Sequence, residues 1–170
     1  MKTEFFKCNG GAPERRDELV CIAPNKRYLL IFGQGKDADG NTYTMRKYYD
    51  HKPDIAELRA DIESLINEQT DTAILDSFVW NGIPVYLSTE NQFNFKAAYD
   101  MAEMSQGASL PVTFKLGENA DKSPVYHTFA ELDDFRDFYT RAMSHVITTL
   151  NEGWREKDSI DYASILSGNE

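Results

Sequence analysis

The residues with the clearest capacity for chemistry lie around the start of a predicted helix. Five polar side chains within seven positions follow a tryptophan, and together they form a candidate binding site: Trp80, Glu90, Asn91, Gln92, Asn94 and Lys96. Amides beside the N–H groups of a helix N-terminus suit a carboxylate, a sugar or a peptide backbone. The same amides can instead cap the helix and hydrogen-bond the preceding backbone. The sequence leaves both interpretations open.

A hairpin precedes these residues. The runs 78–80 and 83–87 flank Asn81-Gly82, the dipeptide most typical of a two-residue hairpin, because a type I′ turn needs positive φ at both central positions. We expect Trp80 to face Tyr86 across this ribbon. Such aromatic residues are more typical of a packed cross-strand pair than of a platform on which a sugar stacks.

The helix after this hairpin has clear start and stop signals. Ser88 or Thr89 is the predicted N-cap, and Gly107 is the predicted stop. Four apolar residues recur at helical spacing and are predicted to face the core: Phe93, Ala97, Met101 and Met104. The hairpin turn, the helix cap and the apolar stripe are all signals for folding, and they account for much of this part of the sequence.

A first hairpin and helix are predicted nearer the N-terminus. Strand-like residues occupy 27–32 and 42–48, and an amphipathic helix follows from about Asp54 to Glu68. The face of this helix that carries acidic residues is interpreted as solvated, because nothing in the sequence makes those carboxylates converge on a metal.

A third hairpin and helix are predicted after the second. The runs 110–116 and 124–129 are strand-like, Thr128 and Glu131 have the spacing of a capping box, and the next helix is expected to end near Gly153. The chain thus predicts an α+β fold of three β-hairpin-plus-helix units, an antiparallel sheet with helices packed on one face.

The order of these elements suggests four segments. We expect an N-terminal segment with a β-hairpin over residues 1–52, a connecting amphipathic helix over 53–71, an α+β domain over 72–162 and a tail over 163–170. A chain of 170 residues can bury a core without metal or disulfide staples.

Charge and cysteine usage exclude several classes of protein. Acidic residues outnumber basic ones 28 to 18, giving a formal net charge of −10, so binding to nucleic acid or to an anionic membrane is not expected. Cys8 and Cys21 lack CxxC spacing and a nearby histidine pair, and we expect two free thiols. No apolar run approaches the ~20 residues of a membrane helix.

No catalytic set is evident in the sequence. His51, His127 and His145 are far apart and match no metal-binding spacing, and GxSxG is absent. We therefore expect no catalytic residue, no metal and no cofactor, and predict that the protein is not an enzyme.

Residues 72–162, about half of the chain, resemble an uncharacterised domain family of phage and prophage proteins from gut Bacteroidetes. The family pattern is W-x-G-x-x-V-x-L-S-x-E-N-Q-x-N, then L-P-x-x-F, F-x-x-L and G-W-x-x-K-D. It matches Trp80, Gly82, Val85, Leu87, Ser88, Glu90, Asn91, Gln92 and Asn94, then Leu110, Pro111 and Phe114, Phe129 and Leu132, and Gly153, Trp154, Lys157 and Asp158.

This resemblance implies a structural or assembly protein associated with a phage tail or tail fibre. Its partner would be a tail or fibre protein, or itself in a homo-oligomer, and its location would be the host cytoplasm during phage production or the virion. The alternative is a phage-encoded protein that binds a small molecule or a host factor, for example an inhibitor of host defence. That alternative would use a pocket near Trp80 and the polar residues 90–96.

Overall fold

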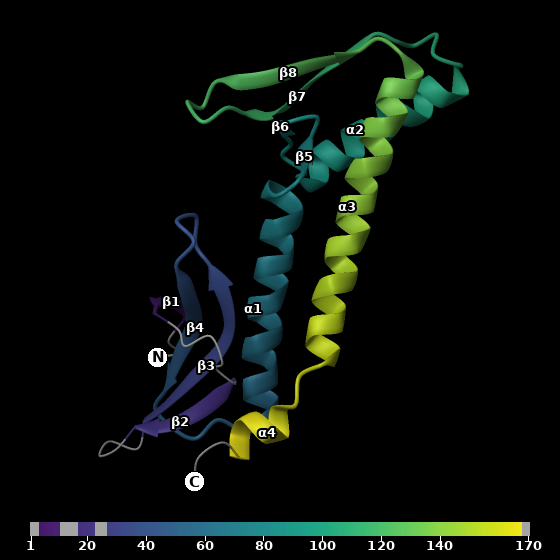
Figure 1. The fold of residues 1–170 in the computed structure, drawn as a ribbon. Helices are drawn as coiled ribbons and strands as arrows, with labels where there is room; N and C mark the ends of the chain where they lie inside the picture. The colour runs from purple at the N-terminus through teal and green to yellow at the C-terminus, as the bar shows by residue number, and fades with distance from the viewer. Residues whose placement is uncertain (1–3, 11–16, 23–26, 168–170) are drawn as a thin grey trace. The chain divides into compact units, whose positions relative to one another are not determined.

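The computed structural model describes residues 4–10, 17–22 and 27–167 (Figure 1). The chain divides into two compact units, residues 1–66 with 157–170 (unit 1) and residues 67–156 (unit 2). Each unit has its own hydrophobic core. The two boundaries fall inside helices α1 (Ile55–Asp76) and α3 (Leu132–Asp158), so that both helices contribute residues to both units.

Unit 1 contains a four-stranded antiparallel sheet in the order β1-β4-β3-β2. Its central pair, β3 (Arg27–Lys36) and β4 (Thr42–Tyr49), is the predicted hairpin. Asp37 closes the connecting loop, because its Oδ1 accepts hydrogen bonds from the backbone N–H groups of Asp39 and Asn41. These bonds also hold the pKa of Asp37 below its ordinary value, chiefly through the Asn41 N–H.

The edge strands β1 (Phe6–Asn9) and β2 (Glu18–Ile22) lie in a segment for which the sequence predicted no strand. Both strands are short, and pairing with β4 and β3 holds them in the extended conformation. Cys8 and Cys21 are free thiols on these opposite edges. Because two strands separate them, their Cα atoms lie at about three strand spacings, roughly 14 Å, well beyond the reach of a disulfide.

The core of unit 1 forms between this sheet and two helices. Leu58 and Ile62 of α1 pack with Leu30 and Phe32 of β3, and α4 (Tyr162–Ser167) adds further apolar side chains. Asp54 begins α1, since its Oδ1 accepts the backbone N–H of Glu57. The helix continues to Asp76, eight residues beyond its expected end at Glu68, because residues 69–75 contain no glycine or proline to stop it.

A buried ion pair completes unit 1. Lys47 Nζ lies 2.6 Å from Asp61 Oδ2, with side-chain exposures of only 8% and 13%. The hydroxyl of Tyr49 donates to the same carboxylate oxygen over 2.8 Å. Burial first, and then the neighbouring carboxylate of Asp61, raise the pKa of the Tyr49 hydroxyl, so it stays a donor.

Unit 2 contains the second and third combinations of a hairpin and a helix. The short hairpin β5 (Val79–Trp80) and β6 (Ile83–Pro84) leads into α2 (Thr89–Met104), and the hairpin β7 (Val112–Glu118) and β8 (Pro124–Phe129) leads into α3 (Leu132–Asp158). The predicted α+β fold and its three repeats of hairpin and helix are therefore confirmed. Among the residues that the structure describes, the strands form one four-stranded and two two-stranded sheets, where the sequence predicted an antiparallel sheet.

The turn of the β5–β6 hairpin is the one that the sequence predicted. Asn81 and Gly82 have φ angles of +48° and +79°, the positive values that a type I′ turn requires. The hairpin pairs Trp80 with Ile83, however, and not with Tyr86. The predicted Trp80–Tyr86 pair is therefore wrong, because a two-residue turn places Ile83 opposite Trp80.

The core of unit 2 is mainly aromatic. Its fully buried rings come from four different elements: Trp80, Phe95, Phe129, Phe135 and Phe138. Phe138 of α3 makes edge contacts with Trp80 and Phe95, at centroid distances of 5.2 and 5.1 Å. This cluster holds α2, α3 and the two hairpins as one body.

A β-bulge links the two hairpins of unit 2. The register of β7 shifts between Lys115 and Gly117, and the backbone carbonyl of Leu116 accepts the N–H of Tyr86 over 2.8 Å. Gly117 lies directly against the carbonyl oxygen of Pro84, where a Cβ atom would overlap it. The absence of a side chain at position 117 therefore lets the segment after β6 reach β7.

Helix α3 departs from its predicted limits at both ends. Thr128 is still in β8 and its hydroxyl pairs with that of Thr113 at 2.8 Å, so the predicted capping box is wrong. Gly153 is not a stop but a buried helical position. It is packed against Thr70 of α1 so closely that a Cβ atom would overlap the threonine Oγ1. Close approach of two helices explains this glycine better than helix termination does.

Candidate functional site

The start of α2 is held by side chains that bond to nearby backbone. Ser88 is the N-cap, and its Oγ accepts the N–H of Asn91 over 3.1 Å. The amide of Asn91 donates to the carbonyl of Tyr86 at 2.9 Å, and that of Gln92 donates to the carbonyl of Leu87 at 2.7 Å. Both amides therefore fasten the helix to the segment that joins β6 to it. This is the capping role that the sequence allowed for them.

Trp80 is buried in the core rather than presented at a surface. Its side chain is 2% exposed, and its Nε1–H donates to Oδ2 of Asp137 over 3.0 Å. This bond is the main cause that lowers the pKa of the Asp137 carboxyl. The indole also meets the ring of His127 edge-on, at a centroid distance of 4.9 Å, and His127 Nε2 lies 3.1 Å from Asp134. Sequence reasoning missed this polar edge of the core because its members are far apart along the chain.

The remaining three candidates lie on exposed positions of α2. Glu90 is in its first turn, and Asn94 follows one turn later. Lys96 pairs with Asp100 four residues on, with its Nζ 2.6 Å from Oδ2, and this contact raises the pKa of the lysine. The six candidate residues thus do not converge on one site.

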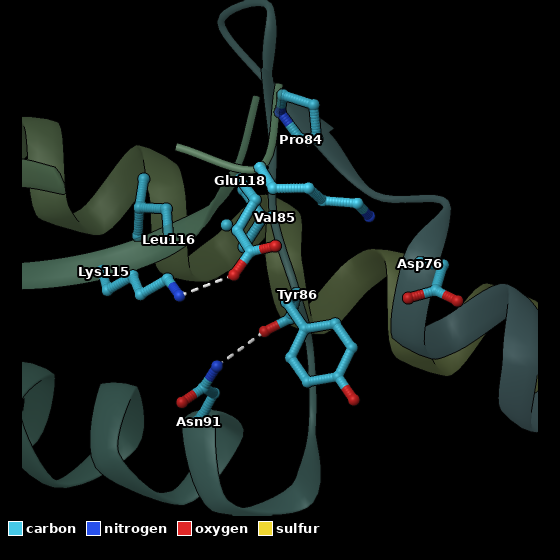
Figure 2. A pocket seen from close by; sticks show the side chains of 10 residues that line it. Asp76, Pro84, Val85, Tyr86, Asn91, Lys115, Leu116 and Glu118 are labelled. Atoms are coloured by element: carbon cyan, nitrogen blue, oxygen red, sulfur yellow. Dashed lines mark hydrogen bonds and ion pairs between the residues drawn. The ribbon is translucent and has the colours of Figure 1, made fainter. Parts of the chain in front are cut away.

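A pocket of about 540 Å³ opens on unit 2 beside the β-bulge (Figure 2). Of the six candidates only Asn91 lines it. The other lining residues come from the end of α1, the segment 84–86 and the β7–β8 hairpin: Asp76, Pro84, Val85, Tyr86, Lys115, Leu116, Gly117, Glu118 and Lys122. The pocket exists because the bulge draws β7 against the segment after β6.

The charges around this pocket are mixed. Lys115 Nζ lies 2.8 Å from Glu118 Oε1, and this ion pair lowers the pKa of Glu118 and raises that of Lys115. Asp76 and Lys122 add one further charge of each sign. The aromatic ring of Tyr86 is exposed at the same place. Such a lining suits a ligand that combines polar groups with a flat or apolar part.

A row of exposed apolar residues lies on the outer side of α2. Phe93, Met101 and Met104 are 71%, 62% and 87% exposed, and Ala97 between them is also exposed. We call these four residues the outer row of α2. The prediction that they face the core is wrong. The inward side is formed instead by Phe95, Ala98, Tyr99 and Ala102.

The reason for this error is that α2 is apolar on two opposite faces. Phe95 fits between Phe114 and Phe138, at centroid distances of 5.0 and 5.1 Å. Tyr99 stacks on Tyr139 of α3 at 4.5 Å. Once these residues pack inward, a helix of 3.6 residues per turn must turn the outer row away from the core.

The three histidines have different neighbours and do not form one centre. His51 contacts Glu57 in unit 1, whereas His127 contacts Asp134 and His145 contacts the carbonyl of Ala73 in unit 2. Within residues 4–10, 17–22 and 27–167, no group of three His, Cys, Asp or Glu side chains is placed to hold a metal ion. No helix among these described residues is both long enough and apolar enough to span a membrane.

Comparison with known proteins assigns no family or function to this chain. The chain matches no protein-family model, no curated protein and no solved structure. Function must therefore be inferred from the outer row of α2, from the pocket beside the bulge and from the sequence pattern of residues 80–158.

Proposed function

We propose that the protein is a phage or prophage structural or assembly protein, associated with the tail or tail fibre, that acts by protein–protein contact. The phage context is supported by the sequence pattern between Trp80 and Asp158. The mode of action is supported by one structural observation, the exposed outer row of α2. It would act in the host cytoplasm while phage proteins are made, or in the virion.

Exposure of the outer row is unfavourable unless a partner covers it. Full burial of a Phe or Met side chain contributes about 1.5–3 kcal/mol each. Aromatic residues and methionine are also enriched at the centre of protein interfaces. A single exposed apolar residue would need no explanation, but a row at helical spacing on a well-packed helix marks an interaction surface.

The polar residues near α2 support contact rather than chemistry. Asn91 and Gln92 hydrogen-bond backbone carbonyl groups, and Trp80 and Asp137 bond to each other at the edge of the core. These groups serve the fold, whereas the outer row of α2 remains exposed. A tail protein, a fibre protein or a second copy of the chain is the partner we propose. The net charge of −10 argues against nucleic acid and anionic membranes.

Size-exclusion chromatography with light scattering tests this proposal. The protein is run alone and mixed with the tail or fibre protein encoded beside it. We expect an assembly larger than the monomer in at least one of the two experiments. A protein that remains monomeric in both, at concentrations well above micromolar, would overturn the proposed function.

A second candidate function, a protein that binds a small molecule or host factor, is favoured by the pocket beside the bulge. Its volume suits a metabolite, a nucleotide or a glycan. Asn91 and Lys122 would supply an amide and an ammonium group, and Tyr86 an aromatic surface.

A thermal-shift screen of these three ligand classes tests the second function. A ligand at 100 times its Kd stabilises the folded state by about 2.7 kcal/mol. The Asn91→Ala and Lys122→Ala variants should reduce such a shift, whereas Arg155→Ala, on exposed helix far along α3, should not. If no ligand in the screen raises the Tm, this second function is refuted and the first proposal stands.

A further inference from the structure

We infer that the partner covering the outer row is a second copy of the chain. The α2 helices of the two copies lie antiparallel and are related by a two-fold axis. This inference rests on the proposed function, which requires a protein partner but does not identify it. Two properties of α2 carry it, the spacing of the outer row and the order of charges along one flank of the helix.

The outer row is self-complementary when two helices run in opposite directions. A two-fold axis near residues 98 and 99 places Phe93 level with the partner's Met104. The same axis places Ala97 level with the partner's Met101. Each of these pairs then contains a flexible methionine, which adapts to its neighbours, and the small Ala97 allows close approach. The row therefore forms a continuous apolar seam with its own copy.

The charges beside the row are self-complementary in the same arrangement. Lys96 and Asp100 occupy one flank, 2.6 Å apart within each helix. A two-fold axis perpendicular to the helices brings this flank against the same flank of the partner. Lys96 then lies within about two residues of the partner's Asp100 along the helix axis, roughly 3 Å at 1.5 Å per residue. Two lysines and two aspartates alternate in sign around this flank.

A parallel pair would lose the charge complementarity. It would set the Lys96–Asp100 flank against the opposite flank, where Asn94 is uncharged and Glu90 lies six residues from Lys96 along the helix, about 9 Å at 1.5 Å per residue. It would also align the two helix macrodipoles, whereas antiparallel helices place opposite partial charges side by side. The antiparallel arrangement is thus the one that the charges of α2 select.

The strength of this dimer should be modest. One pair of helices buries an area at the low end for specific interfaces, below about 1,200 Å². The two chains also carry the same net charge of −10. We therefore expect a reversible equilibrium between monomer and dimer, with a Kd in the micromolar range.

Sedimentation equilibrium of the full chain tests the apolar seam. Phe93→Ser and Met101→Ser should each raise the Kd by about ten-fold or more, with little change in Tm, because both side chains are exposed in the monomer. Ile147→Ser is the matched control, since Ile147 is a similarly exposed apolar residue on α3. Its Kd should equal that of the wild type. A control variant that dissociates as strongly as Phe93→Ser would overturn the assignment to α2.

A charge swap tests the arrangement itself. Lys96→Asp and Asp100→Lys should each weaken self-association by about ten-fold, because each places four like charges on the shared flank. A mixture of the two variants should form a heterodimer at least as tight as the wild type, and the variant with both substitutions should regain the homodimer. If Lys96 and Asp100 only stabilised their own helix, mixing the two variants would not restore dimerisation. Absence of that recovery would overturn the antiparallel arrangement.

The outcome for the wild type separates this inference from the proposed function. A monomer that binds a tail or fibre protein but never itself would refute the second copy as occupant and leave the proposed function standing. A monomer that binds neither would refute both. A dimer that the Phe93→Ser substitution dissociates supports the inference.

Discussion

Gly117 of β7 lies in contact with the carbonyl oxygen of Pro84, where the two hairpins of unit 2 meet through backbone. A Cβ atom at position 117 would overlap that oxygen, and neither backbone can retreat without breaking the bond from Tyr86 N–H to the Leu116 carbonyl. We expect Gly117→Ala to lower the free energy of unfolding by about 1–3 kcal/mol, the usual cost of overpacking. Denaturation in urea measures this loss.

Gly82→Asn is the matched control for this substitution. Gly82 has φ +79° and nothing within 4 Å of a Cβ built on it, and asparagine tolerates that conformation better than other non-glycine residues. Its effect should be small, within about 0.5 kcal/mol, as for surface changes in general. Equal losses in the two variants would show that contact with Pro84 is not what requires glycine at position 117.

Because Gly153 contacts Thr70, we expect the effect of Gly153→Ala on stability to change sign with the residue at position 70. In the wild type, Gly153→Ala should destabilise unit 2 because the new Cβ overlaps Oγ1 of Thr70. The Thr70→Ala background removes the Oγ1 and Cγ2 atoms, and the Cβ at position 70 lies at 3.4 Å, an ordinary contact. There the same substitution should stabilise by up to about 1 kcal/mol, the difference in helix propensity between Gly and Ala. Urea unfolding of the four proteins decides this, and the same sign in both backgrounds would contradict it.

The buried pair of Lys47 and Asp61 predicts a large loss when one charge is removed. Asp61→Ala leaves the Lys47 ammonium and the Tyr49 hydroxyl without the carboxylate that they share. We expect a loss of about 3–5 kcal/mol. Adding Lys47→Met should recover part of it, since the uncompensated buried charge is then gone. Glu118→Ala, which removes an exposed pair, should change stability little. Equal effects of Asp61→Ala and Glu118→Ala would contradict the account.

The bond between Trp80 and Asp137 predicts a dependence of stability on pH. Because the folded protein lowers the pKa of Asp137, its stabilising effect is complete above the unfolded-state pKa of about 3.9, and it is lost as pH falls through the lower folded-state pKa. The difference in Tm between wild type and Asp137→Asn should therefore be largest near neutral pH and shrink below pH ~4. In the Trp80→Phe background this pH-dependent part should be smaller. A difference in Tm that stays constant down to pH ~2 would contradict the assignment.

The sequence predicted those parts of the fold that depend on local signals. The Asn81-Gly82 turn, the Ser88 cap and the alternation of hairpins and helices depend on backbone preferences of a few adjacent residues, and the structure confirms them. The errors occur where distant residues decide. The edge strands β1 and β2 are ordered by their pairing partners, and α3 passes Gly153 because Thr70 lies against it.

The candidate site shows the same division. The role of Asn91 and Gln92 in holding the start of α2 could be foreseen from the capping preference of amides. The pocket could not, because it depends on a bulge that brings Gly117 to Pro84. The outer row of α2 was recognised as an apolar stripe, but periodicity alone does not say whether a stripe meets the core of the same chain or of another.

Oxidation footprinting of Met101 and Met104 shows whether the protein binds its partner through the outer side of α2. Mass spectrometry follows their oxidation by peroxide in the dilute monomer and in the assembly formed alone or with a tail or fibre protein, with the half-buried Met45 as internal reference. We predict fast oxidation of both methionines in the monomer and several-fold protection in the assembly, with Met45 unchanged. An assembly in which Met101 and Met104 oxidise as fast as in the monomer would contradict binding through this side of α2.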